Sequence, residues 1–258
     1  MLNQLCRLCC HKLGKSIFDG FIFYNKIHYF DCLNCGYVQT EQPYWLEKAY
    51  SSAINNCDTG IMARNQLNVG LILATLNSLK SLNGAVVDYA GGYGILVRLL
   101  RDRGIEALWT DPYCTNLLAI GFEYTNEKAD LVTAFEAFEH FVDPLIEVDK
   151  LFAIAPNLLI STSLIASPAP RPNQWWYYGL DHGQHIGFFR VQTLQFIAKR
   201  FNKHLVTDGV SCHLFSEKPV SEFQWKMNTR LVRRFPALYG QNLRSKTWSD
   251  FQKMSGKT

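Results

Sequence analysis

Four cysteines near the start of the chain are spaced like metal ligands. They form two C-x2-C pairs, which are Cys6 with Cys9 and Cys32 with Cys35. A C-x2-C turn presents two thiolates from one tight loop, and zinc takes four such soft ligands in a tetrahedron. Cys10 or His11 could replace the second ligand, but Cys9 keeps the two pairs alike. The sequence therefore predicts a structural zinc site.

The segment between the two pairs favours a small hairpin. Residues 18–32, FDGFIFYNKIHYFDC, are rich in aromatic and β-branched residues, which is typical of strands. A module of this size cannot fold on its own apolar core, so we expect metal binding to stabilise it.

A second group of titratable residues lies in the middle of the chain. Glu136, Glu139 and His140 are spaced i, i+3 and i+4 after the apolar run at 130–135. If the chain turns helical there, the three side chains project from one face.

The stretch at 174–189, QWWYYGLDHGQHIGFF, places a run of rings beside titratable groups. His182 and His185 follow four aromatic residues, which are Trp175, Trp176, Tyr177 and Tyr178. The rings could stack on the apolar face of a sugar or on a base while the histidines serve a reacting hydroxyl. The alternative is a packed lid whose buried histidines are satisfied by backbone. The preceding SPAPRPNQ indicates an exposed insertion.

The elements that would position these residues alternate between strand and helix. The periodicity predicts an amphipathic helix over 59–81, capped by Asp58 or Thr59 and ended by Asn83-Gly84. A buried strand, AVVDY, then leads into the glycine turn AGGYG. A helix closed by Gly104 and a second strand, IEALWTD, follow. This order brings a nucleotide to the carboxyl ends of a parallel sheet.

The rest of the chain continues the pattern. We expect a strand at 130–135, a helix starting at Asp143-Pro144, a strand at 157–162 and a helix at 189–201. Two antiparallel strands at 204–210 and 211–217 end the sheet. A helix at 220–238 and a frayed tail at 242–258 follow.

The glycine turn resembles a known family motif. VVDYAGGYG is similar to motif I of class I S-adenosylmethionine-dependent methyltransferases, whose usual form is D/E-x-G-x-G-x-G. Asp88, Gly92 and Gly94 match it, and Ala90 stands where the first glycine is usual. The resemblance covers about residues 60–216. It implies an α/β fold with a Rossmann-like sheet, parallel except for an antiparallel last strand, preceded by a small zinc-ribbon module.

The resemblance also implies domain limits and cofactor contacts. The limits are 1–42 for the zinc ribbon, 43–82 for a helical linker covering the cofactor pocket, 83–218 for the methyltransferase domain and 219–258 for a C-terminal helix and tail. Asp111 would hold the ribose, and Glu123 lies in the unusually short region expected near the adenine. The implied cofactor-binding residues are Asp88, Ala90, Gly91, Gly92, Gly94, Asp111, Glu123 and Phe135.

The E-x-x-E-H pattern resembles the divalent-metal site of two O-methyltransferase groups, the ubiquinone-biosynthesis enzymes and the small-RNA 2′-O-methyltransferases. In both, a histidine from a loop after the fifth strand approaches the same place, which here is His185. The implied ligands of Mg²⁺ or Mn²⁺ are Glu136, Glu139, His140 and His185. Imidazoles suit manganese better than magnesium, and the ion would lower the pKa of an acceptor hydroxyl. Without metal, His182 or His185 would be the general base.

A zinc ribbon followed by this domain resembles bacterial methyltransferases that act on sugars in polysaccharide and nucleotide-sugar pathways. The leading hypothesis is therefore methyl transfer to a hydroxyl of a nucleotide sugar or glycan. C-methylation of a keto sugar is a variant. The alternatives are an RNA ribose 2′-O-methyltransferase and a non-catalytic scaffold. The scaffold hypothesis rests on Ala90, which stands in place of the first glycine of the motif.

Composition agrees with a globular enzyme of the cytoplasm. The 258 residues are 48% hydrophobic and 19% charged, with eight cysteines and a net charge of +4. No apolar run approaches the roughly 20 residues of a membrane span, and no secretory signal opens the sequence. A reducing compartment disfavours disulfides. The mild charge, collected in RLVRRF and LRSKTW, argues against nucleic acid as first partner. The oligomeric state does not follow from the sequence.

Overall fold

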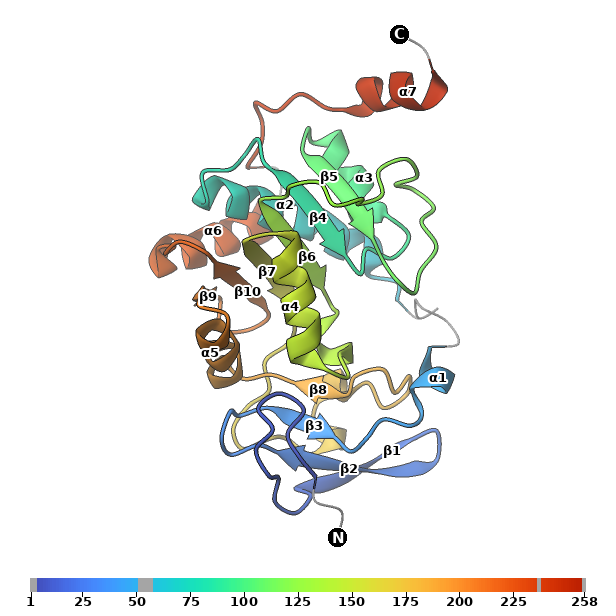
Figure 1. Ribbon diagram of the computed structural model, residues 1–258, viewed down its shortest axis with the longest axis vertical. Coiled ribbons are helices and arrows are strands. Elements are labelled where there is room, and N and C mark those ends of the chain that lie inside the picture. The colour runs from blue at the N-terminus through green and yellow to red at the C-terminus, as the bar shows by residue number, and fades with distance from the viewer. Residues whose placement is uncertain (1–3, 51–57, 236–237, 257–258) are drawn as a thin grey trace.

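Two sheets organise the part of the chain that this computed structural model describes, which is residues 4–50, 58–235 and 238–256 (Figure 1). Among these residues the larger sheet has the strand order β5-β4-β6-β7-β10-β9, and the smaller one has the order β1-β2-β3-β8. The predicted modules at 1–42 and 43–82 and the predicted helix at 220–238 each include a few residues outside the described ranges.

The larger sheet places β5, β4, β6 and β7 parallel to one another. β10 then runs antiparallel to both of its neighbours, β7 and β9. In spatial order the strands are β5 (Glu106–Thr110), β4 (Ala85–Tyr89), β6 (Leu131–Phe135), β7 (Asn157–Ser161), β10 (Cys212–Ser216) and β9 (His204–Thr207). The central strands are apolar and buried, as strands covered on both faces must be. The predicted Rossmann-like sheet is confirmed.

Helices cover both faces of this sheet, with α4 in front of it and α2 behind it in Figure 1. α2 packs against both α3 and α6. The helices are α2 (Ile61–Ser78), α3 (Ile95–Asp102), α4 (Pro144–Ile154), α5 (Val191–Arg200) and α6 (Glu222–Arg234). Pro144 stands in the first turn of α4, where its missing N–H costs no hydrogen bond, so the predicted start at Asp143-Pro144 is confirmed.

The predicted cap of α2 is wrong. Gly60 is the N-cap residue, and no side chain accepts a hydrogen bond from the first turn. Asp58 instead forms an ion pair with Arg64 one turn along the helix. The carboxylate satisfies a nearby guanidinium, so it is not available as a cap.

The smaller sheet begins with the predicted hairpin. β1 (Phe18–Ile22) and β2 (Asn25–Asp31) are antiparallel and joined by Phe23 and Tyr24, both at positive φ as a tight hairpin turn requires. β3 (Val38–Thr40) pairs with β2, and α1 (Leu46–Ala49) follows. The fourth strand, β8 (Gly187–Phe188), comes from the far side of the aromatic stretch and pairs with β3. The sheet therefore crosses the predicted boundary at residue 42.

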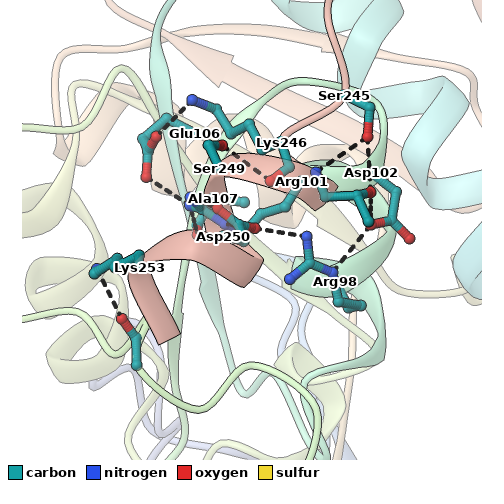
Figure 2. A network of polar contacts seen from close by, with 12 residues as sticks. Arg98, Arg101, Asp102, Glu106, Ala107, Ser245, Lys246, Ser249, Asp250 and Lys253 are labelled. Atoms are coloured by element: carbon teal, nitrogen blue, oxygen red, sulfur yellow. Dashed lines mark hydrogen bonds and ion pairs between the residues drawn. The ribbon is translucent and has the colours of Figure 1, made fainter. Parts of the chain in front are cut away.

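The C-terminal tail is not frayed as predicted. It forms α7 (Thr247–Ser255), which docks on α3 and β5 through charged side chains (Figure 2). Asp250 is 5% exposed and accepts two hydrogen bonds of 2.8 Å from Arg101 and one of 2.6 Å from Arg98. Lys246 pairs with Glu106 at 2.9 Å. These contacts join residues far apart in the sequence, so no local sequence pattern predicts them.

Candidate functional site

The glycine turn joins β4 to α3 at the carboxyl edge of the larger sheet. Ala90, Gly92 and Gly94 have φ of 58°, 53° and 85°, the left-handed region that favours glycine. A Cβ on Gly94 would lie 2.8 Å from the Cβ of Ala119, and one on Gly91 would lie 2.7 Å from Cδ1 of Trp109. The turn is thus tightly packed, and Ala90 adopts a glycine conformation while carrying a side chain.

Asp111 follows β5 and is already engaged by backbone. Its Oδ2 accepts from the N–H of Gly92 at 2.9 Å. Its Oδ1 accepts from the N–H groups of Tyr113 at 2.8 Å and Cys114 at 2.9 Å. A carboxylate has about four acceptor positions, so capacity for a ligand hydroxyl remains. The residue also holds the glycine turn in place, a role that the sequence did not reveal.

The other predicted cofactor residues lie around the same edge. Asp88, at the end of β4, is buried and accepts from Oγ1 of Thr133 at 2.8 Å. The carboxyl of Asp88 is shielded from solvent, and this burial raises its pKa to about 7. Glu123 accepts from Nδ2 of Asn116 at 2.8 Å in an exposed loop. Phe135 ends β6, the strand next to β4.

The four cysteines of the predicted zinc site come together. Their Sγ atoms all lie within 4.8 Å of one another. Cys6 and Cys35 are 3.6 Å apart, and Cys9 and Cys32 are 3.5 Å apart. Four sulfurs at 2.3 Å from zinc would be about 3.8 Å apart, so the thiols fit a tetrahedral ion. Cys10 is exposed and lies outside this group.

The buried carboxyl of Glu139 is the centre of a second cluster. Tyr177 donates to Glu139 Oε1 at 2.6 Å. Nε2 of His140 and Nε2 of His185 lie 3.9 and 4.0 Å from the same oxygen. Glu139 Oε2 is buried and has no hydrogen-bond partner among the described residues. Glu139, His140 and His185 offer ligand atoms within 4.8 Å of one another, which is a geometry that can hold a metal ion.

The second nitrogen of each imidazole is fixed by a neighbour. Nδ1 of His185 lies 2.6 Å from the carbonyl oxygen of Tyr177, which can only accept, so Nδ1 carries the proton. Nε2 of a neutral His185 therefore presents a lone pair toward Glu139. Nδ1 of His140 lies 2.9 Å from the hydroxyl of Tyr50. Second partners of this kind orient metal-binding histidines.

Burial sets the charge state of the cluster. It raises the pKa of Glu139 to about 7, against the opposing hydrogen bond from Tyr177. It lowers the pKa of His185, and it lowers that of His140 well below its usual value. The imidazoles are thus neutral at neutral pH, which is the form that binds metal or accepts a proton.

Two predicted residues, Glu136 and His182, lie outside the group that could hold an ion, although the ring of His182 packs against that of His185 with centroids 4.8 Å apart. The expected helical face is only a 3-10 turn, Phe138–His140. Glu136 precedes it at φ 49°, and its Oε1 accepts from Ser161 at 2.6 Å, outside the group that could hold an ion. Nδ1 of His182 accepts from the N–H of Gln184 at 3.1 Å. A neutral His182 then carries its proton on Nε2, so in this conformer it offers no free base.

The prediction of four stacking rings is wrong for two of them. Tyr177 and Tyr178 are 1% and 0% exposed, in a core shared with the smaller sheet. The hydroxyl of Tyr178 donates to the carbonyl of Pro170 at 2.7 Å. Trp175 is half-buried against that core, and Trp176 is 81% exposed. The 3-10 helix Trp176–Tyr178 turns Trp176 to the surface and both tyrosines to the core.

Tyr50 and the hydroxyl of Tyr177 are site groups that sequence reasoning missed. Tyr50 sits in no motif, and its contact with His140 joins positions far apart in the chain. The hydroxyl of Tyr177 was overlooked because Tyr177 is one of four consecutive aromatic residues, and such runs are usually interpreted as apolar packing. A buried tyrosine hydroxyl normally needs a partner, which was the one available signal.

The fold and the site define an enzyme class. The strand order and the glycine turn after β4 are those of an α/β domain that binds a nucleotide at the carboxyl edge of its sheet. A family model described as a methyltransferase domain matches residues 63–207, more than half of the chain. The chain belongs to this methyltransferase family.

Solved structures show more distant similarity. TnmH is 17% identical, over 68% of this chain and 62% of its own, with a TM-score of 0.46. Magnesium protoporphyrin IX methyltransferase from Synechocystis PCC 6803, solved with SAH, is 16% identical over 66% of this chain and 90% of its own (TM-score 0.45). An O-methyltransferase family protein from Burkholderia thailandensis is 13% identical over 67% and 68% (TM-score 0.44). This chain thus spans less than two thirds of TnmH.

A comparison with curated proteins found no match. Within the described residues, no helix is both long and apolar enough to cross a membrane.

Proposed function

We propose that the chain transfers a methyl group from S-adenosylmethionine to a hydroxyl of a sugar, carried on a nucleotide or a glycan. The observation that carries this proposal is the placement of two groups at one edge. The glycine turn follows β4, and the Glu139 cluster follows β6, its parallel neighbour. Ligands of such sheets bind outside the carboxyl ends of the strands. Donor and acceptor would therefore meet at this edge.

The turn has the properties that a nucleotide cofactor requires. The turn places glycine backbone without Cβ atoms at Gly91 and Gly94, and Asp111 retains about one acceptor position for a ribose hydroxyl. When bound, the cofactor supplies a methyl group already activated on a sulfonium. The protein then has to align an acceptor oxygen and remove one proton.

The lone pair on Nε2 of His185 is suited to remove that proton. The cofactor would supply the methyl group to the acceptor oxygen, and Nε2 of His185 would receive the proton that this oxygen releases. Glu139, about 4.0 Å away, stabilises the resulting imidazolium when ionised. Tyr177 fixes the ring through its carbonyl.

The same atoms fit a divalent ion. The partnerless Glu139 Oε2 and the two Nε2 atoms are an oxygen and nitrogen set suited to manganese or another transition ion. Such an ion would supply positive charge that lowers the pKa of the acceptor hydroxyl. His185 then serves as ligand instead of base, and the two mechanisms are separable by chelation.

Exposed rings near the cluster suit a sugar acceptor. Trp176 is exposed, and Tyr113, next to Asp111, stacks on Tyr50 with centroids 6.0 Å apart and planes 17° apart. Tyr50 in turn contacts His140. An aromatic face binds the C–H face of a sugar while leaving its hydroxyls free to react. We assign the four cysteines of the smaller sheet to a structural zinc.

Mass spectrometry of candidate nucleotide sugars and RNA, incubated with protein and isotope-labelled cofactor, tests the proposal. We expect a labelled sugar with the methyl on oxygen. A methyl on ring carbon indicates C-methylation, and labelled RNA indicates the ribose methyltransferase. Calorimetry that finds no cofactor binding supports a scaffold.

Asp111→Ala tests the cofactor contact. Losing a carboxylate that accepts from ribose hydroxyls should weaken cofactor binding by about 1.5 to 3 kcal/mol, measured by calorimetry. Because Asp111 also holds the glycine turn, a thermal melt is the control. Unchanged affinity would place the ribose elsewhere.

A further inference from the structure

The segment from Gly183 to Arg190 is held by the N-terminal part of the chain, both by residues 4–42, which we call the cysteine module, and by Trp45 and Ala49 just after it. Nε1 of Trp45 donates to the carbonyl of Gly183 at 2.8 Å. Gln184 donates to the carbonyl of Ala49 at 2.9 Å. Gly187 and Phe188 form β8 and pair with β3. His185 lies in the middle of this segment.

The carbonyl of Ile186, the residue after His185, receives two donors from the module. The N–H of Thr40 donates to it at 3.0 Å, and Nη2 of Arg7 donates at 2.5 Å. The N–H of Ile186 donates to the carbonyl of Glu139 at 2.8 Å. Ile186, the residue after His185, thus connects the module to the backbone of Glu139.

Each C-x2-C knuckle supplies one of the charged contacts. Arg7 lies inside the first knuckle, directly after Cys6. Asp31 precedes Cys32, and both of its oxygens accept from Arg190 at 2.8 Å. Arg190 also donates to the carbonyl of Gly36, the residue after Cys35, at 2.9 Å. An ion that holds the four sulfurs in place therefore also holds Arg7, Asp31 and Gly36, which form hydrogen bonds with residues 183–190.

Arg7 is a buried cation that negative charge at the knuckle would stabilise, as the carboxylate of Asp143 also does. Its Nε and Nη1 are buried without a hydrogen-bond partner among the described residues. A buried cation needs a counter-charge, and four thiolates around zinc carry a net charge of −2 beside it.

Close packing leaves the segment little freedom. A Cβ on Gly183 would lie 2.5 Å from Cγ2 of Ile22, and a Cβ on Gly187 would lie 1.8 Å from the hydroxyl of Tyr37. Ile186 and Phe188 are fully buried in the core that the module shares with this segment. The glycine turn of the cofactor pocket, by contrast, is held by Trp109, Thr110 and Asp111 of the larger sheet.

We propose that the metal-loaded cysteine module is a positioning element for His185. Zinc orders residues 183–190 and thereby the acceptor side of the site, while the cofactor turn forms without it. The catalytic part of this statement rests on the proposed function. The structural part does not, because it concerns the order of a backbone segment.

Hydrogen exchange with mass spectrometry tests the structural part on the full chain. Zinc-loaded protein is compared with protein depleted of zinc by a chelator and thiol-reactive mercurial, then reduced. We expect exchange in peptides covering 183–190 to rise at least about tenfold, with peptides covering 85–94 within about twofold. Unchanged exchange at 183–190, equal rises in both regions, or protein that binds no zinc would each overturn the proposal.

Asp31→Asn tests the clamp without removing a metal ligand. It weakens the contact with Arg190, so zinc content should stay at one per chain while exchange at 183–190 rises. The matched control is Asp19→Asn, because Asp19 pairs with Lys26 and His28 inside the hairpin alone. We expect about a tenfold lower kcat for acceptor methylation with an unchanged KM for the cofactor in Asp31→Asn only. Equal exchange and kcat in the two variants would contradict a positioning role, whereas inactivity of the wild type would contradict only the proposed function.

Discussion

Ala90 shows how one residue can keep the geometry of a motif while departing from its sequence. The usual glycine is replaced, yet the backbone keeps a left-handed φ of 58°. An L-residue with a Cβ pays about 1 to 2 kcal/mol for this conformation. Ala90 therefore strains the turn without changing the path of its backbone. The backbone is the part of the turn that a cofactor would contact.

Ala90→Gly should relieve that strain. We expect the free energy of unfolding to rise by up to about 1 kcal/mol, because the gain in the folded state exceeds the extra entropy of an unfolded glycine. The control is Ala155→Gly, where φ is −150° and the substitution should destabilise. Urea unfolding measures both. A destabilised Ala90→Gly would mean that the methyl makes contacts worth more than the strain.

Glu139→Gln distinguishes the two mechanisms. The variant keeps size and removes the charge that would hold an ion beside His140 and His185. With a metal, EDTA should abolish turnover, Mn²⁺ should restore it, and excess Mn²⁺ should partly rescue the variant. With His185 alone as base, chelation should change the rate little. Metal analysis confirms that the cysteine zinc stays bound. If neither EDTA nor the substitution changes the activity, the divalent-ion mechanism is wrong.

Single residues were predictable where a motif or spacing names them. Glu139, His140 and His185 meet as the E-x-x-E-H resemblance implied, and the four cysteines meet as their spacing implied. Glu136 diverges because residues 136–138 break the helical spacing on which the prediction depended. Tyr50 could not be predicted, since its contact with His140 depends on the path of the chain between two elements.

At the scale of elements, α7 departs most from expectation. Its sequence is short and rich in polar residues, which favours fraying when judged locally. Asp250 nevertheless holds the helix to α3 through Arg98 and Arg101 (Figure 2). Such pairing depends on two surfaces that meet only in the fold, so the sequence of either segment by itself does not predict it.

Asp250→Asn should undock α7. Burial alone would raise the pKa of Asp250, but the hydrogen bonds from Arg101 and Arg98 outweigh it and lower the pKa below its usual value. A carboxyl with a lowered pKa stabilises the fold above its unfolded pKa, and this contribution is lost as pH falls through the folded pKa. We expect Asn to cost about 1.5 to 3 kcal/mol at pH 7, in urea unfolding. The difference between variant and wild type should shrink below about pH 4, since protonation of Asp250 in the wild type then removes the charge that the variant already lacks.

The control for Asp250→Asn is Asp102→Asn. Asp102 also pairs with Arg98 and accepts one hydrogen bond from Thr247 of α7 at 3.1 Å, but it lies on α3 itself and is more exposed. Its loss should cost well under about 1 kcal/mol, as for exposed pairs. Equal losses in the two variants, or a pH-independent difference, would contradict the assignment of α7 docking to Asp250.

At the scale of the whole molecule, the larger sheet was predictable, whereas only the hairpin of the smaller sheet was. Strand, turn and helix signals repeat along residues 85–216, so the order of the larger sheet follows from known connection rules. The smaller sheet takes β8 from near residue 187, and β8 is too short to show a strand pattern. The predicted boundary at residue 42 therefore separates segments that share a core.

Deleting residues 1–42 should consequently damage the rest of the chain. Ile22, Tyr29 and Val38 pack in one buried cluster with Tyr178 and Phe188, so removal exposes a contiguous apolar surface. We expect the shortened chain to aggregate, as light scattering would show, because exposed patches of this kind associate. Deleting residues 242–258 is the control: α7 is held chiefly by charged contacts, and uncovering them leaves a hydrated surface. A chain of residues 43–258 that scatters no more light than the full chain, and retains exchange protection at 183–190, would show that the segment orders itself without the cysteine module.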